Sequence, residues 1–169
     1  LDWFPPDAPD STKNYARQGI AAAKAGLPYN LDNWGGYPAA RSRLLQAAQG
    51  ADVNLVVVTG DSHNGWAFDL AEDNKPVGVE FGGHSVTSNG LEAATRGTDP
   101  ASIARALVMA SKELRWADTS NRGYMHLSLT PEAATNEWVF MDTVKTLSSA
   151  TKPGHRMKVR PGRKVLEAA

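Results

Sequence analysis

The spacing of hydrophobic residues along the chain alternates between helical and strand patterns, which predicts a mixed α/β fold. An Ala-rich segment that begins near Asp10 and ends before Gly26 is predicted as a first helix. A second helix is predicted from Pro38, a favourable first helical residue, to Gly50. Residues 55–58, LVVV, are apolar at every position, which predicts a central strand covered on both faces.

The rest of the pattern predicts further strands around one long loop and one long helix. The predicted strands are 65–70, 76–82, 125–129 and 138–144; the loop is 83–99, and residues 155–167 form a hairpin with its turn at Pro161-Gly162. From Ile103 to Ala117, apolar residues recur every three or four positions, so we expect a helix from Pro100 through Ala117. Pro5, Pro6 and Pro9 predict an extended start.

Composition and charge limit the classes of protein. With 169 residues, 41% of them hydrophobic, the chain is long enough for one domain with a sizeable core. We divide it into residues 1–150 and a basic hairpin or tail, 151–169, packed on the same domain. The absence of cysteine excludes disulfides and thiolate ligands, and no apolar stretch reaches the roughly 20 residues that span a bilayer.

The formal net charge is zero, with 18 basic and 18 acidic residues, but the charge is unevenly distributed. The tail contains six basic residues but only one acidic residue, Glu167. The basic residues are Lys152, Arg156, Lys158, Arg160, Arg163 and Lys164. Such a tail could bind an acidic partner, a membrane surface or nucleic acid. A solvated edge is the commoner role of such a segment, and we expect no nucleic-acid binding.

A polar cluster, Gly60-Asp61-Ser62-His63-Asn64, follows the apolar strand directly. In open α/β sheets, ligands bind outside the carboxyl ends of the strands, because the loops converge there. A carboxylate and an imidazole one residue apart can face the same space, where they suit metal ions or phosphoryl oxygens. The spacing is also compatible with a simple turn in which Asp61 accepts backbone hydrogen bonds.

Two other functions are compatible with the same residues. Gly60-Asp61-Ser62 resembles the first block of GDSL-type serine esterases, in which Ser62 would be the nucleophile, although the Asp-x-x-His that supplies their base does not occur here. The chain could also be a non-catalytic interaction module. Metal-dependent chemistry at Asp61 and His63 is the interpretation that the remaining motifs favour.

Three ordered motifs resemble the PhoD-like alkaline phosphatase and phosphodiesterase family of calcineurin-like metallophosphoesterases. They are LDNWGGYPAARSRLL, then LVVVTGDSHNGWAFDL with PVGVEFGGHSVTSNGLE, and Asn121-Arg122-Gly123-Tyr124. The resemblance covers roughly residues 27–145. It implies the C-terminal half of a four-layer αββα sandwich, with metal ions, calcium and iron by analogy with the family, at the strand ends.

The resemblance also assigns roles to individual residues. Asp61 and His63 match the family's metal-binding Gly-Asp-x-His, with His63 also at the catalytic phosphate position. Asn64 and Arg122 are candidate substrate-binding residues, and Arg122 could instead pair with Asp118. The implied substrate is a phosphate mono- or diester, and the implied location is periplasmic or secreted.

Three differences from the family pattern are informative. Gly35 occupies a position where the family commonly has Asp, and His84 one that is more often Thr or Pro. The family's earlier metal-binding motifs do not occur in these residues and would lie N-terminal to Leu1. We therefore expect the missing N-terminal half of the domain to be this chain's partner, and the chain to be inactive alone.

Overall fold

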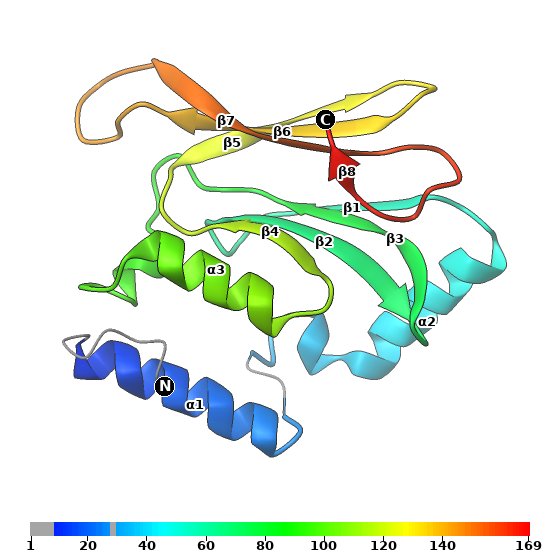
Figure 1. Ribbon diagram of the computed structural model, residues 1–169, viewed down its shortest axis with the longest axis horizontal. Coiled ribbons are helices and arrows are strands. Elements are labelled where there is room, and N and C mark those ends of the chain that lie inside the picture. Colours follow the sequence, from blue (N-terminus) through cyan, green and yellow to red (C-terminus); the bar gives the residue numbers. More distant parts are fainter. Residues whose placement is uncertain (1–8, 28–29) are drawn as a thin grey trace.

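The computed structural model describes residues 9–27 and 30–169, in which helices cover one face of two stacked β-sheets (Figure 1). The helices are α1 (Asp10–Lys24), α2 (Pro38–Gly50) and α3 (Pro100–Ala110), with short 3₁₀ turns η1 (Trp34–Gly36) and η2 (Leu91–Ala93). The predicted first two helices are therefore confirmed. The predicted extended start at residues 1–8 lies outside the described residues. No helix in the described part has the length and apolarity needed to cross a membrane.

The sheet next to the helices contains β1 (Leu55–Thr59), β2 (Gly65–Glu72), β3 (Lys75–Gly82) and β4 (Leu114–Asp118), in the order β1-β3-β2-β4. β1 runs parallel to β3, and the other pairs are antiparallel. Asp73 and Asn74 have positive φ in the predicted turn between β2 and β3. The prediction of a central strand at 55–58 is wrong for the described residues: β1 is an edge strand, and Val58 is 52% exposed.

The second sheet is antiparallel throughout. It contains β5 (Gly123–Leu129), β6 (Ala134–Met141), β7 (Thr151–Val159) and β8 (Glu167–Ala168), in sequence order. The predicted hairpin is confirmed, because β7 pairs with β8 across a loop in which Gly162 has φ +75°. The boundary at residue 150 stays a prediction. Ion pairs join Arg156, Arg160 and Lys164 to acidic groups, so half of the tail's basic side chains have local partners.

The predicted helix from Pro100 through Ala117 is wrong in its second half. Helix α3 ends at Ala110, Ser111 adopts an extended conformation, and residues 114–118 form β4. The apolar residues fit both structures: Leu114 and Ala117 continue the helical spacing, whereas in the strand Leu114 is buried and Trp116 packs on the core. Pairing with β2, in which Leu114 lies opposite Phe68, satisfies the backbone of this segment.

The main core lies between the two sheets. Val79 and Phe81 from β3 meet Trp138 from β6, and all three are fully buried. Phe81 and Trp138 pack edge to face with ring centroids 5.8 Å apart, and Trp138 Nε1 donates a hydrogen bond of 2.8 Å to the Gly82 carbonyl. A second cluster, around Leu45 of α2, covers the other face of the first sheet.

The described residues form three layers: helices, a mixed sheet and an antiparallel sheet (Figure 1). They make an α/β sandwich, as the sequence predicts, with no helix on the outer face of the second sheet in the described part. Strand β1 and the turn that follows it lie in the sheet beside the helices. The site residues therefore follow the end of an edge strand of that sheet.

Candidate functional site

The turn Gly60–Asn64 connects β1 to β2 and has an unusual backbone. Asp61 and His63 have φ +64° and +60°, in the left-handed region that favours glycine. Ser62 N also donates to the Gly60 carbonyl at 2.7 Å, which tightens the turn. Backbone strain of this kind concentrates at functional sites, where surrounding contacts must maintain it.

His63 has a defined orientation within this turn. Its Nδ1 lies 2.7 Å from the backbone carbonyl oxygen of Asn89. A carbonyl can only accept a hydrogen bond, so Nδ1 carries the proton and Nε2 of a neutral ring is left with a lone pair. Asp61 is exposed in the same turn. The structure therefore presents one imidazole nitrogen and one carboxylate that can act as ligands.

Asn64 and Ser62 make contacts that stabilise the turn. Asn64 is 4% exposed; its Oδ1 accepts the Leu91 amide at 3.1 Å, and its Nδ2 donates to the Ser62 carbonyl at 2.5 Å. The Ser62 hydroxyl accepts a hydrogen bond of 2.6 Å from Trp66 Nε1. No histidine nitrogen hydrogen-bonds to Ser62 within the described residues, so the base that a serine nucleophile requires is absent there.

Arg122 pairs with Glu92, and the prediction that Asp118 could be its partner is wrong. The Arg122 guanidinium forms an ion pair and a hydrogen bond with the Glu92 carboxylate, and its side chain is 11% exposed. Glu92 also accepts the Gly90 amide with both carboxylate oxygens, at 3.1 Å each. Burial acts to raise the pKa of Glu92, but the bonds from Arg122 and Gly90 outweigh it and lower that pKa.

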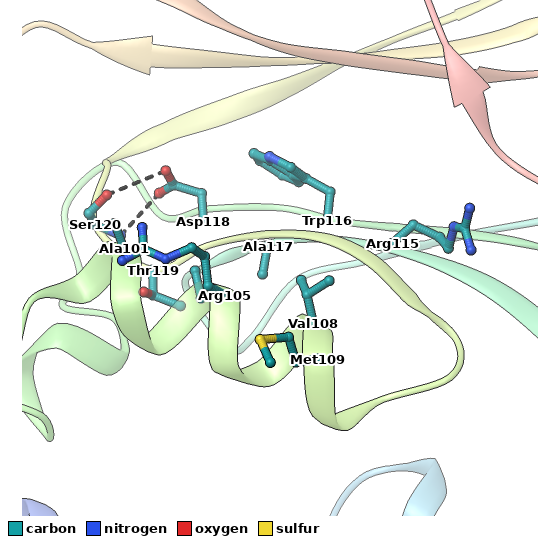
Figure 2. A pocket seen from close by; sticks show the side chains of 11 residues that line it. Ala101, Arg105, Val108, Met109, Arg115, Trp116, Ala117, Asp118, Thr119 and Ser120 are labelled. Atoms are coloured by element: carbon teal, nitrogen blue, oxygen red, sulfur yellow. Dashed lines mark hydrogen bonds between the residues drawn. The ribbon is translucent and has the colours of Figure 1, made fainter. Parts of the chain in front are cut away.

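Asp118 instead pairs with His84, whose side chain is fully buried between the sheets. His84 Nε2 lies 3.1 Å from Asp118 Oδ1, which also accepts the amides of Ser120 and Asn121. Figure 2 marks the hydrogen bonds between Asp118 and Ser120. Burial acts to raise the pKa of Asp118, yet these hydrogen bonds hold it well below its usual range. A methyl group on Gly65 would overlap the His84 ring. The unusual His84 therefore lies directly under the end of the site turn.

Asp118 also borders a hollow of about 520 Å³ between α3 and the edge strand β4. Figure 2 shows the side chains that line it. Arg105 and Met109 of α3 and Arg115 of β4 line other parts of it. Asp118 is engaged by the turn that follows β4, and Arg105 and Arg115 pair with Asp99 and Asp69. The charged side chains that line the hollow therefore all have partners among the described residues.

A metal ion fits the donors of the site turn only in part. Carboxylate oxygen and imidazole nitrogen are common ligands for calcium and iron respectively. In residues 9–27 and 30–169, no group of three or more His, Asp or Glu side chains converges to hold an ion. Asp61 and His63 can thus provide a share of a coordination shell, and other residues must complete it.

Geometry and fold together define an α/β sandwich with a strained turn at a strand end that carries a carboxylate and an imidazole. The chain belongs to the PhoD-like phosphatase family, whose model matches residues 10–138. It is 30% identical over 138 residues to alkaline phosphatase D of Bacillus subtilis strain 168, and the match covers 78% of this chain and 22% of that protein. A solved structure of PhoD superposes with a TM-score of 0.65 at 24% identity, covering 82% of this chain and 26% of the other. The chain spans about a quarter of the length of these relatives.

Sequence reasoning named Asp61 and His63 as candidates but missed the groups that hold the turn in place. The Asn89 carbonyl, the Leu91 amide and the Trp66 indole contact the turn, and none of them belongs to the polar cluster itself. Asn89 acts through its backbone, which leaves no signal in the residue type. The sequence Asn89-Gly90 marks a turn in the long loop, and this was the one available sign of a close backbone approach.

Proposed function

We propose that this chain supplies part of the metal site of a phosphoric ester hydrolase, with Asp61 and His63 as ligands. The contact between His63 Nδ1 and the Asn89 carbonyl carries this proposal. Metal-binding histidines almost always donate the other ring N–H to a carbonyl or carboxylate, which fixes the tautomer and the ring orientation. His63 is held in this way in the folded chain.

The chemistry follows from the two donors. A bound metal ion supplies a Lewis acid that polarises the phosphoryl oxygen and lowers the pKa of attacking water. Asp61 would hold it through carboxylate oxygen, and His63 Nε2 would bind it or hydrogen-bond to the phosphate. Calcium and iron are the proposed ions, by family membership and by donor type. The proposed substrate is a phosphate mono- or diester.

Asn64 and Arg122 remain predicted substrate contacts. The Asn64 amide hydrogen-bonds at both ends, and one terminal nitrogen of Arg122 binds Glu92. Any contact with a phosphate would therefore use the remaining donors of these side chains. Because Asn64 and Arg122 already bind other groups of the protein, the proposal depends on Asp61 and His63.

The intact enzyme requires more than this chain. Its metal site needs further ligands, and we propose that the rest of the catalytic domain, N-terminal in sequence, supplies them. The chain alone is then inactive. Family membership also supports an exported, periplasmic or secreted protein.

Metal binding by the purified chain tests the site directly. In a Mn²⁺ titration followed by ¹H–¹⁵N NMR, amide signals of residues 60–64 should broaden selectively. Asp61→Asn and His63→Gln should each weaken that effect roughly tenfold or more. Ser62→Ala is the matched control, because Ser62 lies between the two proposed ligands in sequence and its hydroxyl contacts Trp66, so its loss should leave binding intact. Equal broadening in all four proteins would refute the assignment.

Hydrolysis tests the proposal for the whole protein. With 4-nitrophenyl phosphate and its bis-ester, the 169-residue chain should give no metal-dependent turnover, whereas the protein that includes the remaining domain should. Metal-dependent turnover by the chain alone would contradict the need for further ligands. Loss of turnover in Ser62→Ala would instead indicate that Ser62 acts as a nucleophile.

A further inference from the structure

The segment Asn89–Glu92 holds His63 from outside the site turn. Asn89 O contacts His63 Nδ1, and the next residue, Gly90, packs against the turn. A Cβ at Gly90 would lie 2.5 Å from Asn64 Oδ1 and 3.0 Å from the His63 carbonyl oxygen. With no room between the two segments, any displacement of Gly90 moves the Asn89 carbonyl relative to the imidazole.

Glu92 fixes the conformation of that segment. Both of its carboxylate oxygens accept the Gly90 amide at 3.1 Å, which closes a short ring over residues 90–92. The same carboxylate pairs with Arg122, thirty residues further along the chain. Charge-assisted hydrogen bonds of this kind are stronger than neutral ones and are more directional.

Arg122 has a rigid base, which makes it a suitable anchor. It lies on the crossover between the two sheets, where its carbonyl accepts the Met141 amide at 2.8 Å. Four residues before it, Asp118 accepts the amides of Ser120 and Asn121. Figure 2 shows the bonds between Asp118 and Ser120. The position of Glu92 is therefore set by both sheets.

We propose that Glu92, anchored by Arg122, is a positioning residue for His63. Glu92 keeps the Asn89 carbonyl within hydrogen-bond distance of His63 Nδ1. The proton of the neutral ring then stays on Nδ1, and the orientation of the ring, with Nε2 free to accept, is fixed. The use of Nε2 by metal or phosphate rests on the function proposed above. The effect of Glu92 on the imidazole does not depend on that function.

The test is the tautomer of His63, read from ¹⁵N chemical shifts of the imidazole in the purified chain. Wild type should show a protonated Nδ1 and an unprotonated Nε2. Glu92→Ala should shift His63 toward the Nε2–H tautomer that free histidine prefers. Glu92→Gln should be intermediate, because its amide oxygen can still accept one hydrogen bond.

Glu113→Ala is the matched control. Glu113 also pairs with an arginine, Arg41 at 2.9 Å, and also accepts a backbone amide, that of Ala71 at 2.9 Å. A general loss of stability would affect both alanine variants, but only Glu92→Ala should change the His63 signals. Gly90→Ala provides a second route that retains both charged residues, since its methyl group must displace the segment from Asn64 Oδ1 and also from Glu92 Oε2, which would lie 2.9 Å away.

An unchanged His63 tautomer in Glu92→Ala, or an equal change in Glu113→Ala, would overturn the proposal. If Glu92→Ala does not fold, an unchanged His63 tautomer in Glu92→Gln and Gly90→Ala would overturn the proposal instead.

A Mn²⁺ titration separates this proposal from the proposed function. Wild type that binds no Mn²⁺ would count against the metal site alone, whereas a bound ion should be held about tenfold more weakly by Glu92→Gln.

Discussion

Replacing Trp138 with Phe should remove a specific link between the two sheets. Trp138 is fully buried, and its Nε1 donates to the Gly82 carbonyl at 2.8 Å. Gly82 lies opposite Thr59, the last residue of β1, so this bond supports the strand end from which the site turn begins. Phe keeps most of the ring contacts, including those with Phe81, but leaves a buried carbonyl without its donor.

The expected loss can be worked out from these contacts. An unsatisfied buried acceptor costs about 1–3 kcal/mol, and the lost ring atoms add about 1 kcal/mol. With an m value of about 2–3 kcal/mol/M, the urea midpoint should fall by about 1 M. Circular dichroism is the appropriate probe, because the substitution removes a fluorophore.

Trp66→Phe is the matched control for that substitution. Trp66 Nε1 donates to the exposed Ser62 hydroxyl at 2.6 Å, and water can replace the lost donor. Its cost should therefore stay below about 1 kcal/mol. If Trp66→Phe lowers stability as much as Trp138→Phe, the buried hydrogen bond is not the reason for the larger effect, and the reasoning fails.

Two further predictions concern stability. Burial lowers the pKa of His155, which stacks on Trp116 with centroids 4.5 Å apart. The unfolded chain therefore binds a proton near pH 6.5 that the folded chain does not, so the unfolding free energy should decline below about pH 6.5, and less steeply in His155→Phe. Urea titrations at several pH values measure this slope; equal slopes in both proteins would contradict it. Asp99 accepts the amides of Ala101 and Ser102 at the start of α3, so Asp99→Ala should cost about 1 kcal/mol in urea, and no change would show that the cap is dispensable.

Local signals were sufficient for most of the fold. The helix starting at Pro38 and the strand beginning at Leu55 have clear start and stop signals and short-range patterns. Residues 111–118 lack such a signal, since Leu114 and Ala117 continue the spacing of the preceding helix. The open edge of β2 decided the outcome, because Trp116 could pair there opposite Ala67. Sheet pairing of this kind depends on contacts that no local pattern encodes.

The candidate site was likewise only partly predictable from local sequence. Asp61 and His63 are separated by one residue in sequence, so their proximity needed no tertiary information. The groups that orient His63 come from further along the chain: Asn89, 26 residues away, contacts His63, and Arg122, 30 residues beyond Glu92, contacts Glu92. Arg122 illustrates the limit, because a cation near a predicted phosphate site resembles a substrate ligand until its ion pair is seen.

The conformation of the site turn depends on these distant contacts for an energetic reason. Left-handed backbone at Asp61 and His63 costs roughly 1–2 kcal/mol for each residue. Three hydrogen bonds oppose this cost, from His63 Nδ1 to Asn89, from the Leu91 amide to Asn64, and from Trp66 to Ser62. Each contributes about 0.5–1.5 kcal/mol, so the two sides nearly balance. The bond from Trp66 to Ser62 is exposed, so water can replace it. The two bonds that come from the segment fixed by Glu92 are therefore the ones whose loss should relax the turn.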